Sequence, residues 1–108
     1  MAPYSGSAPI NTTAPLNMGR RGMGAWYFEG NIDEVALFDD VMTQAQASAI
    51  YNSGTPTDLS GESYLLGYWR NGDTAGTSVY PTIEDYSANG NDGTMTNMAS
   101  GDIVTVVP

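Results

Sequence analysis

The chain has 108 residues, which suits one domain, and 41% of them are hydrophobic, enough to form a packed core. Twelve acidic residues against three arginines give a net charge of −9, which disfavours nucleic acid and membranes as partners and attracts cations, although acidity also serves solubility alone. Because cysteine and histidine are absent, disulfides, thiolate or imidazole metal sites and cysteine nucleophiles are excluded, and a metal ion would be held by oxygen ligands, as calcium is.

The first part of the chain, residues 1–15, is rich in Ala, Pro, Ser and Thr, and its three prolines recur every six residues. Proline opposes helix, so we expect an extended arm or linker there, followed by a single domain or part-domain over residues 16–108. The N-terminus has neither a basic start nor an apolar core, so we expect no signal peptide in this chain. No stretch reaches the ~20 apolar residues of a membrane-spanning helix.

Short apolar or aromatic runs alternate with turn residues along most of the remaining chain. We expect strands at residues 16–18, 25–29, 32–38, 64–70, 78–83, 93–97 and 102–107. Within residues 32–38, Val35 and Leu37 should face one side of the strand, and Glu34, Ala36 and Phe38 the other. About seven short strands with turns every 8–12 residues favour an all-β fold, an antiparallel β-sandwich or jelly roll with one short helix.

That helix is predicted over residues 44–52. Thr43 and Gln46 have the spacing of a capping box, and Gly54 stands where a C-terminal cap belongs. Because so short a helix is marginal alone, Ile50 and Tyr51 should pack on the sheet.

The densest polar stretch is EDYSANGNDGTM, residues 84–95. Oxygen-bearing side chains alternate there before and after a glycine, as in the first half of a calcium loop. The candidate ligands in this stretch are Asp85, Ser87, Asn89 and Asn91. The position of the EF-hand glutamate holds Thr96, so the loop is not an EF-hand. Asn-Gly and Asp-Gly are also favoured turn sequences, and we favour a plain turn over a calcium site.

Two segments resemble parts of a known family. YFEGNIDEVALFDDVMTQAQASAIYNSG, residues 27–54, resembles the closing segment of the laminin-G-like, concanavalin A-like jelly rolls of the lectin/glucanase superfamily. LLGYWRNGD followed by IEDYSANGNDGTMTNM, within residues 65–98, resembles the opening segment of the same family. The family order is reversed here and its middle strands are missing. The resemblance therefore implies a permuted domain, a junction between tandem domains, or a part that completes its sandwich with another chain or in an oligomer, which we favour.

The resemblance also implies a site and a location. It suggests Asp33 as the partner of Asp85 in holding calcium. The ending NGNDGTMTNMASGDIVTVVP, residues 89–108, resembles the tails of such domains in virion surface proteins of marine bacteriophages. A virion-surface or extracellular location follows as an expectation.

Aromatic side chains offer a second candidate site. Most of them should fill the core, whereas Tyr80 and Tyr86 lie near loops and are the candidates for stacking on carbohydrate. The paired acids at residues 33–34 and 39–40 point to opposite faces of a strand, so we expect no catalysis. We expect a non-catalytic, lectin-like module that binds cell-surface glycans. The alternative is a structural virion protein, a decoration or fibre segment, that binds other protein chains.

Overall fold

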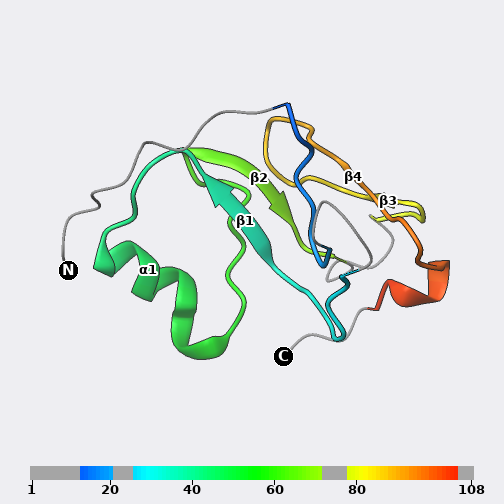
Figure 1. Cartoon of the computed structure of the whole chain (residues 1–108). Coiled ribbons are helices and arrows are strands. Elements are labelled where there is room, and N and C mark those ends of the chain that lie inside the picture. Colours follow the sequence, from blue (N-terminus) through cyan, green and yellow to red (C-terminus); the bar gives the residue numbers. More distant parts are fainter. Residues whose placement is uncertain (1–12, 21–25, 72–77, 105–108) are drawn as a thin grey trace. The chain divides into compact units, whose positions relative to one another are not determined.

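The computed structural model describes residues 13–20, 26–71 and 78–104, and the chain divides into two compact units, Met1–Gly30 and Asn31–Pro108 (Figure 1). In the first unit, Arg20 and Tyr27 form a single antiparallel bridge, and the amide of Phe28 donates to the carbonyl of Gly19 at 2.9 Å. The strand predicted at residues 16–18 is wrong, and the strand predicted at 25–29 contributes only this bridge, its first residue lying outside the described part. Most of the predicted arm, residues 1–12, also lies outside it.

The second unit holds every regular element of the described residues. In chain order these are β1 (Val35–Phe38), α1 (Gln44–Tyr51), the 3-10 helix η1 (Asn52–Gly54), β2 (Leu65–Trp69), β3 (Thr82–Ile83), β4 (Gly93–Thr94) and the 3-10 helix η2 (Ser100–Asp102). β1 pairs antiparallel with β2, and β3 pairs antiparallel with β4. The unit is thus rich in antiparallel strands with one short α-helix, as predicted, and its described strands form two small two-stranded sheets.

β1 lies in the segment of residues 27–54 and β2 in the segment of residues 65–98. Their pairing joins the two segments that carry the family resemblance. Val35 pairs with Trp69 and Ala36 with Tyr68, and an irregularity in register follows between Leu37 and Phe38. β1 begins later than predicted because Glu34 has a φ of 50°, a left-handed conformation that cannot continue a strand. The two segments that carry the resemblance therefore pair with each other within one chain.

The capping box of α1 is confirmed. The amide of Gln46 donates to Thr43 Oγ1 at 3.1 Å, and the amide of Thr43 donates to Gln46 Oε1 at 2.8 Å. The helix ends earlier than predicted, because Asn52 adopts the left-handed conformation that had been expected at Gly54. The helix is eight residues long. No helix in the described part of the chain is long and apolar enough to cross a membrane.

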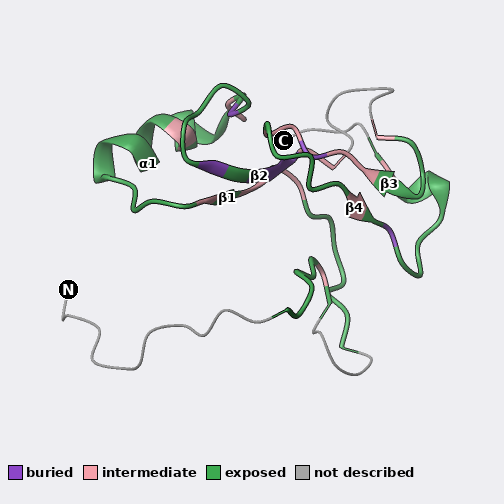
Figure 2. Ribbon diagram, turned by 90° about the horizontal axis from the view of Figure 1, so that it is seen from above, coloured by how far each residue is buried: buried purple, intermediate pink, exposed green. Residues whose placement is uncertain are grey.

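The core lies where β1, β2 and α1 meet. Leu59, Leu65 and Tyr68 are buried, and half-buried side chains pack around them (Figure 2). These surrounding residues are Ala36, Phe38, Ile50 and Tyr86. The predicted alternation of β1 is confirmed, because Ala36 and Phe38 pack against the core while Leu37 is exposed. Ile50 packs as predicted, whereas Tyr51, also expected to pack, is 70% exposed.

The last three predicted strands are shorter than expected or absent. Residues 78–83 contribute only β3, and residues 93–97 contribute only β4. Residues 100–102 form η2, Ile103 and Val104 are irregular, and residues 105–107 lie outside the described part. Two-residue strands hold few backbone hydrogen bonds, so side chains must fix the segments around them.

Candidate functional site: a polar loop bound to the edge of strand β2

Asp85 is the centre of the polar loop, and its side chain is only 6% exposed. Its Oδ1 accepts hydrogen bonds from the amides of Tyr68, at 2.9 Å, and Ser87, at 2.8 Å. Its Oδ2 accepts from Ser87 Oγ at 2.8 Å and from the amide of Asn91 at 2.7 Å. Four donors thus surround one carboxylate, which meets the requirement that a buried charge be hydrogen-bonded.

The neighbouring polar side chains bind the backbone of β2. Asn89 Nδ2 donates to the carbonyls of Leu65 and Leu66 at 2.9 and 3.0 Å. Asn91 Nδ2 also donates to the Leu66 carbonyl, at 3.0 Å. Trp69 Nε1 in turn donates to the carbonyl of Asn91 at 2.9 Å. The loop is therefore held against the edge of β2 that β1 leaves open, where Trp69 and Asp85 form an isolated bridge.

This arrangement sets the charge state of Asp85. Burial alone would raise the pKa of its carboxyl, but the hydrogen bonds from the amides of Tyr68, Ser87 and Asn91, together with the Ser87 hydroxyl, outweigh burial and lower it below its ordinary value. The carboxylate is thus ionised at neutral pH, with its charge neutralised by donors of the chain itself.

The predicted calcium ligands are only partly brought together. Asp85, Ser87, Asn89 and Asn91 share the loop, while Asp33 lies two residues before β1, on the other side of β2. There its Oδ1 accepts from the amide of Glu34 at 2.9 Å. No group of three or more acidic side chains in the described ranges is placed to hold a metal ion. The hydrogen bonds agree with the turn interpretation, and calcium binding stays a prediction.

The two tyrosines predicted to bind carbohydrate differ in their surroundings. Tyr86 is half-buried against the core, and its ring meets that of Tyr68 edge-on, with 6.3 Å between the ring centroids. Tyr80 is 43% exposed and lies just before β3. Of the two, Tyr80 is the more accessible aromatic surface.

A second polar cluster, around Glu34, was not predicted. Glu34 Oε1 accepts from Arg70 Nε at 3.0 Å in a part-buried ion pair, and its Oε2 accepts from the hydroxyl of Tyr68. Burial of the Tyr68 side chain and then its hydrogen bond to Glu34 raise the pKa of the phenol. A signal for this cluster was present in the sequence, because Glu34 shares its predicted face with Ala36 and Phe38, where a charge needs a partner.

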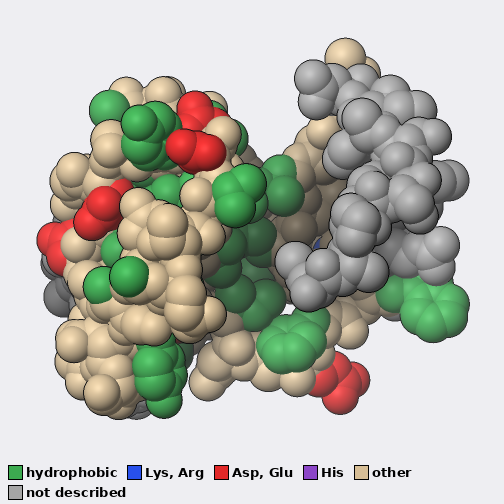
Figure 3. Space-filling view, turned by 90° about the vertical axis from the view of Figure 1, so that its left-hand side faces the viewer, with side chains coloured by type: hydrophobic (Ala, Val, Ile, Leu, Met, Phe, Trp, Pro, Cys, Tyr) green, Lys and Arg blue, Asp and Glu red, His purple; other side chains and the backbone are tan. Residues whose placement is uncertain are grey.

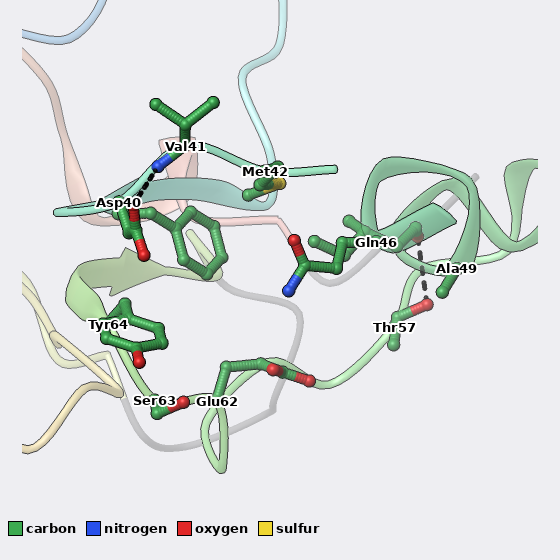
Figure 4. A pocket seen from close by; sticks show the side chains of 11 residues that line it. Asp40, Val41, Met42, Gln46, Ala49, Thr57, Glu62, Ser63 and Tyr64 are labelled. Carbon is green, nitrogen blue, oxygen red and sulfur yellow. Dashed lines mark hydrogen bonds between the residues drawn. The ribbon is translucent and has the colours of Figure 1, made fainter. Parts of the chain in front are cut away.

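A cavity of about 190 Å³ lies between α1 and the segment that follows β1 (Figure 4). Its walls combine apolar side chains with the acids Asp40 and Glu62. Viewed from the side on which α1 lies, hydrophobic and acidic side chains share the surface (Figure 3). None of the residues predicted to bind a ligand lines this cavity.

No protein family, curated protein or solved structure matches this chain.

Proposed function

We propose that this chain is a non-catalytic structural module that binds another protein chain and completes a laminin-G-like β-sandwich with it, as on a virion surface. The role follows the family resemblance of the sequence, in which opening and closing segments are present without the strands between them. The partner supplies the missing strands and covers the apolar side chains that β1 and β2 leave exposed.

One observation carries this proposal: among its described residues, the second unit exposes more large apolar side chains than it buries. Its buried ones are Leu59, Leu65, Tyr68, Trp69 and Met95. The exposed ones include Leu37 of β1 and Leu66 of β2, at 40% and 44%, and Val41 beyond β1. Apolar side chains left exposed on paired strands are surface that a protein partner would bury.

The strand arrangement supports the same role. β2 is flanked by β1 on one edge and by the Asp85 segment on the other, whereas β1 has one neighbouring strand among the described residues. A two-stranded sheet is marginally stable in water, and an open strand edge offers its amides and carbonyls to a further strand. The outer edge of β1 is therefore the position at which a partner strand adds.

A second candidate is the glycan-binding module, favoured by the exposure of Tyr80. An aromatic ring at the surface suits the apolar face of a sugar. A glycan array on the purified chain tests it, and binding lost in Tyr80→Ala but kept in Tyr51→Ala would favour the lectin over the structural module.

Light scattering coupled to size exclusion tests the protein-binding role over a range of concentrations. We expect a mass above the 11.4 kDa of the single chain that grows with concentration, or a monomer that unfolds without a cooperative transition. Leu37→Lys should weaken association by about tenfold or more, because it places a charge in the contact, whereas Val79→Lys, another exposed apolar position, serves as control. A monomer with one cooperative unfolding transition at every concentration would contradict the proposal.

A further inference from the structure

The cavity beside α1 has a lining that selects for a particular ligand chemistry. Its apolar wall comes from the end of β1, from the segment that follows β1 and from α1, and includes Phe38, Met42, Ala49 and Ile50. Acidic side chains stand at its rim: Asp40 follows β1, and Glu62 precedes β2. No basic side chain lines it.

The size of the cavity limits what fits. A volume of about 190 Å³ is slightly larger than the ~150 Å³ apolar cavity that accommodates benzene in an engineered protein. It therefore holds one side chain or one small organic group, and not an oligosaccharide or a peptide backbone.

The two charged side chains that line the cavity are both acidic. Asp40 and Glu62 carry two negative charges, and neither has an ion-pair partner in the described part of the chain. Asp40 Oδ1 accepts only from the amide of Val41, at 2.8 Å. In Figure 4 the ring of Tyr64 and the carboxylate of Glu62 border the same space, and the amide nitrogen of Gln46 faces it. The capping box fixes that orientation, since Gln46 Oε1 is held by the Thr43 amide.

We propose that this cavity binds an organic cation with an apolar stem, namely the side chain of a lysine or arginine presented by the partner chain. The stem lies against the apolar wall, the ammonium or guanidinium group meets the two carboxylates, and the ring of Tyr64 adds a cation–π surface. That the cation comes from a partner chain rests on the proposed function. Charge complementarity also favours a basic partner, because this chain carries a net charge of −9 and contains no lysine.

The 108-residue chain can be titrated with n-butylammonium, which reproduces the end of a lysine side chain, and with 1-butanol, its neutral counterpart. We expect shifts of the backbone amide resonances in α1 and at residues 62–64, with butylammonium bound about five- to tenfold more tightly than butanol, because two exposed ion pairs contribute about that factor. Equal affinity for the two probes, or shifts confined to other residues, would overturn the proposal.

Charge-removing variants locate the effect. Asp40→Asn combined with Glu62→Gln should weaken butylammonium binding by about five- to tenfold and leave butanol binding unchanged. The matched control, Asp39→Asn combined with Glu29→Gln, removes the same charge from exposed positions outside the cavity and should change the affinity less than twofold. Amide spectra of both variants check that the fold persists. An equal loss in both variants would overturn the cavity as the site and indicate a net-charge effect only.

The source of the cation is tested separately with lysine blocked at both ends, N-acetyl-lysine methylamide. Binding comparable to that of butylammonium supports a side chain of a protein partner. Exclusion of the blocked lysine while butylammonium binds would overturn a protein source. Light scattering reports on the protein-binding module and the titrations report on the cation site, so failure of one is distinguishable from failure of the other.

Discussion

Asp85 stabilises the loop through four hydrogen bonds, because each of its two carboxylate oxygens accepts two. Asp85→Asn removes the charge and turns an NH2 group toward two of those donors. We expect it to lower the free energy of unfolding by about 2–4 kcal/mol, since hydrogen bonds to a buried charge are strong and the donors are left unpaired. Urea unfolding followed by circular dichroism measures the change. Asp39→Asn, at an exposed position, should stay within about 0.5 kcal/mol, and an equal loss in both variants would contradict the assigned role.

The pH dependence of stability follows from the same carboxylate. Its pKa in the folded chain is lower than the ordinary value of 3.8, so its contribution is present above that value and is lost as the pH falls through the folded pKa. We expect the melting temperature to decline below about pH 4, and to decline less steeply in Asp85→Asn. A hydrogen bond from the amide of Ser60 likewise lowers the pKa of Asp58, so Asp58→Asn compares Asp85 with an exposed acid. Identical pH profiles for Asp85→Asn and the unchanged chain would refute this assignment.

These residue-level roles could be predicted from the sequence only in part. The alternation of Asp85, Ser87 and Asn89 marked the loop, and its turn chemistry is visible in the chain itself. The donors that decide between turn and metal site include the amide of Tyr68 and lie on β2, and only the fold brings them to the carboxylate. Tyr86 was expected to be exposed, but it packs against Tyr68 because the fold brings the loop to β2.

At the scale of elements, β2 tolerates no side chain at Gly67. A methyl group there would lie 2.3 Å from the ring of Trp69, which itself binds the Asn91 carbonyl. We expect Gly67→Ala to displace the indole and cost about 1–3 kcal/mol of stability, as other overpacked sites do. Tryptophan emission, measured in a Trp26→Phe background, should shift to the red. Gly61→Ala, where an added methyl meets nothing within 4 Å, should leave the spectrum unchanged, and an unchanged Gly67→Ala would contradict the close packing.

The elements that could be predicted are those whose signals are local. The capping box of Thr43 and Gln46 lies within four residues, and the structure has it as expected. The strands were predicted too long because their ends depend on partners distant in the sequence. β1, for example, begins only after Glu34, which has a left-handed conformation and binds Tyr68 and Arg70. The contacts of Glu34 with Tyr68 of β2 and with Arg70, which follows β2, are not visible in a local pattern.

For the whole molecule, calcium distinguishes the two interpretations of the loop. Because four donors of the chain already surround the Asp85 carboxylate, we expect millimolar calcium to change the melting temperature by less than about 1 °C. Differential scanning fluorimetry with calcium, with magnesium and with chelator measures this. A rise of several degrees that calcium alone produces and a chelator reverses would restore the metal site.

β2 is bonded on both edges, to a segment that precedes it and to one that follows it. During synthesis, β1 leaves the ribosome about 30 residues, and α1 about 20 residues, before β2, the strand against which Ala36 and Phe38 pack. Until then those side chains are open to chaperones and to neighbouring nascent chains. The time at which β2 emerges therefore sets how long the growing chain is exposed to aggregation, and slowing translation before residue 65 should raise the insoluble fraction.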